Sequence, residues 1–218
     1  MEVVADEKAA ARRAAELIAA AGAEAAAARG PFGFAMSGGR TPWAMLAILG
    51  ELERMPWEAT ELFQVDERIA SPGSEDRNLT HMVLGLSMDH QSTLRPMPVT
   101  QRDLEGAAHD YEGSLPERLD LVHLGLGPDG HTASLVPGDP VLEVGDRRVA
   151  LTETAYQDHR RMTLTYPAID AARQIVWLVT GAEKREALAK LLAGDRSIPA
   201  GRVENERMVV VADEAAAG

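Results

Sequence analysis

The sequence predicts an α/β fold in which a mostly parallel sheet is flanked by helices. Short apolar runs of strand length alternate with helical segments along the whole chain, and turn signals rich in Gly and Pro follow several of these runs. The 218 residues are enough for one substantial core and short for two, so we expect a single domain over residues 1–218. No internal repeat or linker interrupts the pattern.

Composition and charge narrow the class of protein. The formal net charge of −12 argues against a nucleic-acid surface and requires that any anionic ligand be held by local positive groups. The absence of Cys excludes disulfides, thiolate nucleophiles and cysteine-based metal sites. No charged and apolar leader opens the chain and no apolar run reaches membrane-spanning length, so we expect a cytoplasmic protein without a membrane partner.

The first predicted element is an Ala-rich helix over Asp6–Arg29. Asp6 can cap its start and Gly30 with Pro31 ends it. Leu17 and Ile18 give the helix an apolar face, so we expect it to pack on the domain by that face.

A Gly-rich turn follows the first predicted strand, Phe32–Met36, and opens the next predicted helix. Thr41 stands where an N-cap belongs and Pro42 at the first helical position, where its missing N–H costs nothing. Backbone N–H groups at the start of a helix can bind an anion. The candidate binding residues are Ser37, Gly38, Gly39, Arg40 and Thr41. The alternative is a plain turn with two permissive glycines.

Three charged residues, Asp66, Glu67 and Arg68, follow the next predicted strand, Glu61–Val65. Such a run is usually a solvated strand end, yet here it lies at the same end of the predicted sheet as the Gly-rich turn. Asn78 then precedes a helical run to Leu86.

The strongest local signal is the strand Leu119–Leu126 and the turn after it. Gly127 and Pro128 stop the strand, and Asp129, Gly130 and His131 follow. Ligands of open α/β sheets bind at the carboxyl ends of the strands. An Asp and a His two positions apart at such an end predict a catalytic pair; the alternative is an ordinary Asp-Gly turn.

The other histidines have no motif around them. His123, in the middle of a predicted strand, is expected to be a buried, hydrogen-bonded core residue, and the others are expected to be structural or exposed: His81, His90, His109 and His159.

The C-terminal part continues the alternation of strands and helices. The expected strands are 147–151, 161–165, 174–179 and 208–212, and the expected helices are 101–115, 166–172 and 182–192. Lys184 lies in the first turn of the last helix, where a cation opposes the helix dipole unless it shares an anion. The alternative is an ordinary exposed lysine.

Four segments together resemble the 6-phosphogluconolactonase family: Ser37–Pro42, Asp66–Arg68, Ser74–Asn78 and Gly125–Gly138. The sister deaminases of glucosamine 6-phosphate share the Asp-Gly-His core but continue with an Ile-Ala-Phe-Asn-Glu-Pro type run, whereas this chain continues with Thr132-Ala-Ser-Leu-Val-Pro137. They also tend to have Asp-Glu-Tyr where this chain has Asp66-Glu67-Arg68. Arg40 departs from the family, which has a small residue there, and Arg77 stands at a usual Ser position.

The resemblance implies an open Rossmann-like sheet and hydrolysis of 6-phospho-D-glucono-1,5-lactone to 6-phospho-D-gluconate. His131 would be the base that activates water, oriented by Asp129. Arg68 would hold the phosphate or the oxyanion, and Asp66 would bind sugar hydroxyls or position Arg68. The implied substrate-binding residues are Ser37, Gly38, Gly39, Arg40, Thr41, Glu67, Gly127, Gly130 and Lys184.

No ligand-spaced metal cluster and no dinucleotide fingerprint occur, so we expect no metal and no cofactor. The expected partner is the small-molecule lactone, and the expected state is a monomer or small homo-oligomer without nucleic acid. Two alternatives remain. One is a glucosamine-6-phosphate deaminase or isomerase, and the other is a non-catalytic sensor of sugar phosphates.

Overall fold

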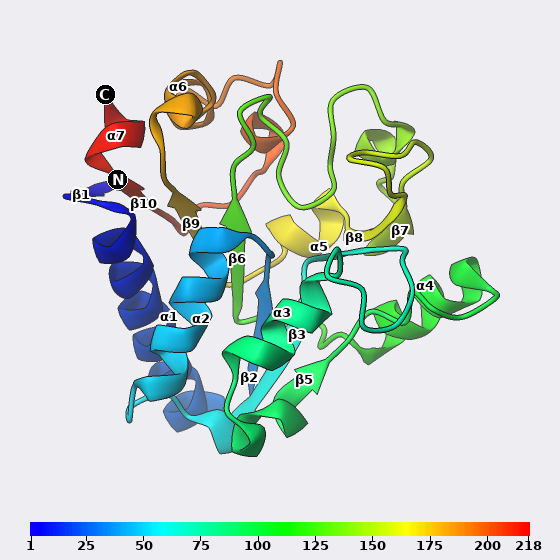
Figure 1. Cartoon of the computed structure of the whole chain (residues 1–218), viewed down its shortest axis with the longest axis horizontal. Helices are drawn as coiled ribbons and strands as arrows, with labels where there is room; N and C mark the ends of the chain where they lie inside the picture. The colour runs from blue at the N-terminus through cyan, green and yellow to red at the C-terminus, as the bar shows by residue number, and fades with distance from the viewer.

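A seven-stranded parallel sheet forms the centre of the protein (Figure 1). The computed structural model describes residues 1–218, with the side chains of residues 91 and 92 left aside. The strand order is β1-β10-β9-β6-β2-β3-β5. The strands are β1 (Glu2–Val4), β2 (Phe32–Met36), β3 (Thr60–Gln64), β5 (Leu94–Arg95), β6 (Leu121–Gly125), β9 (Ile175–Val179) and β10 (Met208–Asp213).

The strand order reverses direction between β2 and β6. From β2 the chain continues to β3 on one side, while from β6 it continues to β9 on the other. In open α/β sheets the carboxyl ends of the two strands at such a switch point border a crevice that binds ligands. The topology therefore places the segments after β2 and β6 side by side, and these are the Gly-rich turn and the Asp-Gly-His turn.

Helices cover both faces of the sheet. On one face lie α1 (Glu7–Arg29), α2 (Arg40–Glu51) and α3 (Asn78–Gly85). On the other lie α4 (Leu104–Ser114), α5 (Tyr166–Asp170), α6 (Arg185–Leu192), α7 (Glu214–Ala217) and a three-stranded antiparallel sheet of β4 (Asp66–Arg68), β8 (Arg161–Leu164) and β7 (Val149–Leu151). Short 3-10 turns complete the chain: η1 (Trp57–Ala59), η2 (Met88–Thr93), η3 (Pro140–Glu143), η4 (Ala182–Lys184) and η5 (Ala200–Arg202).

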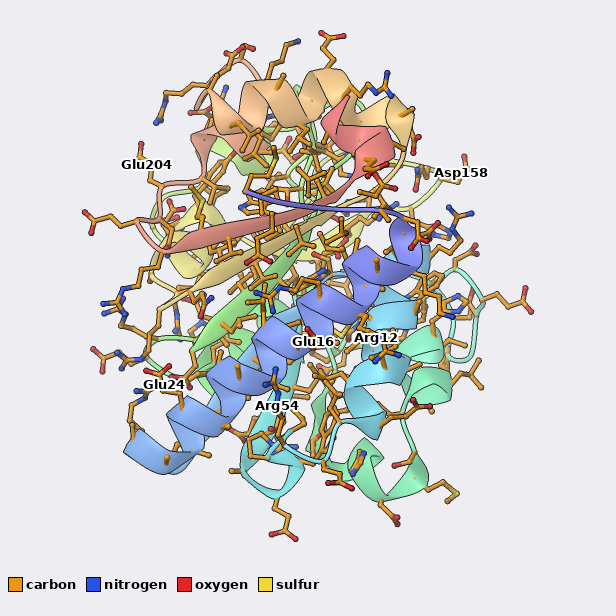
Figure 2. All side chains as sticks on the ribbon, turned by 90° about the vertical axis from the view of Figure 1, so that its left-hand side faces the viewer. Arg12, Glu16, Glu24, Arg54, Asp158 and Glu204 are labelled. Carbon is orange, nitrogen blue, oxygen red and sulfur yellow. The ribbon has the colours of Figure 1, made fainter. Side chains whose placement is uncertain are left out.

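The strand side chains alternate between two cores, one under each layer of helices. In β9, for example, Trp177 packs on the side of α4 to α6 and Val176 on the side of α1 and α2. Buried alanines and Ile18 line the inner face of α1, and the small alanine side chains allow close packing on the sheet. Its outer face carries charges, and Figure 2 shows Arg12 and Glu24 directed away from the protein.

Most of the expected elements are confirmed. Helix α1 begins after Asp6, whose side chain accepts a hydrogen bond from the amide of Ala9 at 2.7 Å, and it ends at Gly30. Several elements differ from the expectation. Strands β1 and β5 are not expected from the sequence, residues 66–68 form strand β4, and the last helical segment begins with the 3-10 turn η4.

His123 lies fully buried in β6, but the expectation that it is hydrogen-bonded is wrong. Its ring lies between Met36 and Val176 of the neighbouring strands, on the side of α1 and α2. Neither ring nitrogen has a hydrogen-bond partner in the described part of the chain. Burial lowers the pKa of His123 to about 3, so the ring is neutral near neutral pH.

Among the described residues, none of the helices is both long and apolar enough to cross a membrane.

Candidate active site

A cavity of about 520 Å³ opens at the carboxyl ends of β2, β6 and β9. This volume is in the range of small-molecule sites. The structure brings ten predicted site residues to its wall: Ser37, Gly38, Gly39, Arg40, Thr41, Asp66, Arg68, Gly127, His131 and Lys184. Asp129, Glu67 and Gly130 are not among the residues that line the cavity, but Asp129 contacts His131, which does line it.

The turn after β6 fixes the pair formed by Asp129 and His131. The amide of Gly127 donates to the carbonyl of His131 at 2.8 Å, and the amide of Gly130 donates to the carbonyl of Gly127 at 3.0 Å. Oδ1 of Asp129 lies 2.6 Å from Nδ1 of His131 and also accepts a hydrogen bond from the His131 amide at 3.2 Å. A turn closed by backbone bonds thus holds both side chains in one orientation.

Glycine is required at two positions of this turn. A Cβ atom on Gly127 would lie 2.0 Å from Nδ1 of His131, so any side chain there would displace the imidazole. Gly130 has a φ of 82°, which favours glycine, and a Cβ there would approach Ile198 to 2.5 Å. Gly130 therefore shapes the turn and is not among the residues that line the cavity, and its role in substrate binding stays a prediction.

The charge of Asp129 sets the role of each nitrogen of His131. The hydrogen bond from His131 lowers the pKa of Asp129 to about 2, so the carboxylate is ionised at neutral pH. An ionised carboxylate only accepts hydrogen bonds, so Nδ1 must carry the hydrogen that lies between them. In a neutral imidazole with this tautomer, Nε2 has a lone pair that can accept a proton.

The Gly-rich turn after β2 begins the helix earlier than predicted. Helix α2 starts at Arg40 with Gly39 as its N-cap, so Thr41 is not the cap and Pro42 is not the first helical residue. The hydroxyl of Thr41 donates to Oε1 of Glu7 at 2.8 Å. The amides of Arg40 and Thr41 have no intrahelical partner, and both residues line the cavity, so the anion site at this turn stays a prediction.

Arg40 lies at the rim of the cavity. Its guanidinium pairs with the carboxylate of Glu7 at 3.0 Å and is 85% exposed. The side chain is therefore held by Glu7 at the surface, and Arg40 is also among the residues that line the cavity.

Lys184 approaches the same end of the cavity from the turn after β9. Thr41 and Thr180 join the two segments, with their hydroxyl oxygens 2.9 Å apart. Burial lowers the pKa of Lys184, against the opposing effects of Glu183 and Asp129. A half-buried lysine in a cavity wall is not the ordinary exposed residue that was the alternative interpretation.

Asp66, Arg68 and Asn78 form a second polar wall. Asp66 accepts a hydrogen bond from the Ser134 hydroxyl at 2.6 Å. Arg68 donates to Oδ1 of Asn78, whose Nδ2 donates to the carbonyl of Asp66 at 2.9 Å. This places Asp66 as a residue that orders the wall, and Ser134 as a hydrogen-bond donor to it.

Glu67 has a structural role. Its carboxylate is fully buried and accepts hydrogen bonds from the amides of Asn78 and Leu79, at 2.7 and 2.9 Å. An acidic group at this point caps helix α3 and complements its dipole. These contacts give Glu67 a role in the fold, and its predicted contact with substrate stays a prediction.

Sequence reasoning missed Arg161, Tyr156, Gln157 and Thr180. Arg161 is only 4% exposed, although it opens strand β8, and it lies directly opposite Arg68 in the antiparallel register. Nη1 of Arg161 lies 3.7 Å from Oδ2 of Asp66, and Nε has no partner among the described residues. Like charges opposite each other are unfavourable, so this pair favours an anion between them. No local sequence signal marks Arg161, because its place in the site depends on the register of β8 opposite β4.

Metal-ligating side chains do not gather in the described part of the chain: no group of three or more His, Asp or Glu residues is placed to hold an ion.

Comparison with known proteins identifies the family. The model of the family "Glucosamine-6-phosphate isomerases/6-phosphogluconolactonase" matches residues 5–212. The chain belongs to this family. The match includes every residue of the cavity wall and the turns that carry them.

The related proteins differ in how similar they are to this chain. A 6-phosphogluconolactonase of Synechocystis is 38% identical over 184 residues, which cover 78% of this chain and 75% of the relative. The crystal structure of a 6-phosphogluconolactonase from Thermotoga maritima superposes with a TM-score of 0.85 at 25% identity and 97% coverage of both chains. A monomeric glucosamine-6-phosphate deaminase has a TM-score of 0.79 at 20% identity, covers 100% of this chain and 99% of its own, and shares the fold alone.

Proposed function

We propose that the protein hydrolyses 6-phospho-D-glucono-1,5-lactone to 6-phospho-D-gluconate, the second step of the oxidative pentose phosphate pathway. The observation that carries the proposal is the Asp129–His131 pair, with His131 in a cavity that the start of helix α2 and Lys184 also line. The 38% identity to a named 6-phosphogluconolactonase supports this activity over that of the sister deaminases.

The reaction needs one proton transfer in each direction. Nε2 of His131 takes a proton from water as the water oxygen attacks the lactone carbonyl carbon. The negative charge of the tetrahedral intermediate collapses to a carboxyl group as the bond from that carbon to the ring oxygen breaks. His131 then returns the proton to the ring oxygen, and Asp129 stabilises the imidazolium between the two transfers.

Positive groups at two places in the cavity hold the substrate. The amides at the start of α2 and Lys184 surround one end, which suits the phosphate because a phosphate accepts several charge-assisted hydrogen bonds. Arg68 and Arg161 face each other on the second wall, near Tyr156 and the catalytic pair. We assign them to the charge that develops on the lactone oxygen.

The first test is lactone hydrolysis itself. Acid release from freshly prepared 6-phosphogluconolactone should exceed spontaneous hydrolysis, and kcat/KM for unphosphorylated gluconolactone should be lower by about 100-fold or more, because each charge-assisted hydrogen bond is worth roughly 1.5–3 kcal/mol. Equal kcat/KM values for the two lactones would contradict the phosphate site. Ammonia release from glucosamine 6-phosphate, with no lactone turnover, would favour the deaminase.

The second test is Lys184→Ala. We expect kcat/KM for the phosphorylated lactone to fall by about 10–100-fold and that for the plain lactone to stay within about threefold, since only the former carries the phosphate. Lys190→Ala is the matched control, because Lys190 lies on the next turns of the same segment and pairs with Glu186 at the surface. An equal loss for both lactones would place Lys184 at the reacting carbonyl instead.

Cytoplasmic location and a monomeric or small oligomeric state stay predictions from the sequence.

A further inference from the structure

We propose that Tyr156 is a positioning residue that fixes the Asp129–His131 pair by donating its hydroxyl hydrogen to Oδ2 of Asp129. The inference rests on the proposed lactonase chemistry, in which His131 is the base. It adds a third side chain to the pair, from a hairpin that the sequence motif does not include.

Of the two side-chain atoms near the Tyr156 hydroxyl, only one can accept its hydrogen. Oη of Tyr156 lies 3.4 Å from Oδ2 of Asp129 and 3.4 Å from Nδ1 of His131. Nδ1 already directs its hydrogen to Oδ1 of Asp129 and has no free lone pair. Of these two atoms, the hydroxyl can therefore donate only to Oδ2. Catalytic hydrogen bonds are often this long before substrate binds and shorten in the complex.

The ring of Tyr156 also restrains the imidazole. The two rings meet edge to face, with centroids 5.0 Å apart and planes at 60°. This is a favourable geometry for an aromatic pair. Rotation of the His131 ring away from Asp129 would break both the packing and the hydrogen bond at Nδ1, so the two contacts act together.

A strained hairpin holds Tyr156 in this place. Gln157 and Asp158 have φ values of 50° and 66°, in the left-handed region, and join Tyr156 to His159 across a two-residue turn. Such a turn favours Gly, Asn or Asp, so Gln157 is unusual there. Asp158 lies at the edge of the molecule in Figure 2. Non-glycine residues in this region commonly mark functional sites.

Contacts on both sides anchor the hairpin. Nε2 of His159 lies 3.3 Å from Oδ2 of Asp76, which ties the hairpin to the loop before α3. Nη2 of Arg161 donates to the carbonyl of Tyr156 at 2.9 Å, and its guanidinium lies 5.6 Å from the centroid of the Tyr156 ring. Tyr156 thereby connects the cationic wall to the catalytic pair.

Tyr156 is suited to be a permanent donor. Burial, together with the nearby charge of Asp129, raises the pKa of the phenol above its usual value. The hydroxyl keeps its hydrogen at every pH at which the enzyme is expected to work.

The test is Tyr156→Phe, which keeps the ring and removes the hydroxyl. We expect kcat to fall by about 3–10-fold with KM unchanged within about twofold, because a single hydrogen bond that acts on the base affects the transition state and not substrate binding. In the free protein, solvent exchange of the His131 Nδ1 hydrogen, followed by NMR, should become about threefold faster or more. A rise in KM with unchanged kcat would instead make Tyr156 a substrate contact and overturn the proposal.

Two comparisons separate positioning from a general loss of stability. Tyr166→Phe removes a hydroxyl that donates to the carbonyl of Pro199, away from the cavity, and should change neither kcat nor the exchange rate. In an Asp129→Asn background, Tyr156→Phe should have no further effect on kcat, since the hydroxyl acts through Asp129. A full effect in that background would overturn the proposal. The exchange measurement needs no substrate, so it tests the Tyr156 contact even if the lactonase assay fails.

Discussion

His131→Ala should lower kcat by about 10²–10⁴-fold and leave KM nearly unchanged. The imidazole accepts a proton as water attacks, and it contributes little to binding of the ground state. Its side chain is partly exposed at the end of a turn that backbone bonds hold closed, so its removal should have a slight effect on folding. Steady-state rates with the phosphorylated lactone, corrected for spontaneous hydrolysis, measure the change.

Two further variants sharpen this prediction. Asp129→Asn should give a smaller loss than His131→Ala, because it disturbs the orientation and charge of the ring without removing it. His109→Ala, an exposed histidine on α4, should have no effect on kcat. A His131→Ala protein that is folded and retains near-normal kcat would show that another group activates water.

The pH dependence distinguishes the two members of the pair. A protonated imidazole cannot accept a proton from water, so kcat/KM should fall towards acid pH if His131 is the base. The fall cannot belong to Asp129, since the hydrogen bond from His131 holds its pKa at about 2. An acid limb that persists unchanged in His131→Ala would point to a different carboxylate, such as Asp66.

The two turns at the switch point could be predicted because their signals are local. Gly39, Gly127 and Gly130 shape the turns, and the strands that precede them are continuous apolar runs. Parallel strands must then bring the two turns to the same edge of the sheet. Thus the meeting of His131 and the Gly-rich turn at one cavity could be predicted without knowledge of the tertiary structure.

The second wall of the cavity could not be predicted because it depends on long-range pairing. Glu67 appears in the sequence as one of three exposed charges, but the amides of α3 satisfy its carboxylate in the fold. Arg161 comes to the site only because it pairs with Arg68 in the antiparallel register of β4 and β8. Tyr156 comes to the site only because its hairpin folds back over the turn after β6. Periodicity and composition do not contain these pairings.

Loss of stability in mild acid should follow from His123. In the folded protein burial lowers its pKa to about 3, whereas an unfolded chain protonates histidine near ~6.5. The unfolded state therefore binds more protons, so the contribution to stability is complete above ~6.5 and is lost as the pH falls. The expected loss is about 1.4 kcal/mol per pH unit, or about 2 kcal/mol at pH 5.

His123→Leu isolates this contribution. Urea unfolding of both proteins at several pH values between about 7.5 and 5 should show a smaller loss of unfolding free energy in the variant. Asp170, whose pKa burial raises to about 6, acts with the opposite sign, but it is present in both proteins and cancels in the difference. If the unfolding free energies of the wild-type protein and the variant fell in parallel with pH, the prediction would be contradicted. Because neither nitrogen of His123 has a partner, leucine should cost little stability at pH 7.5, which leaves the slope with pH as the measure of the buried ring.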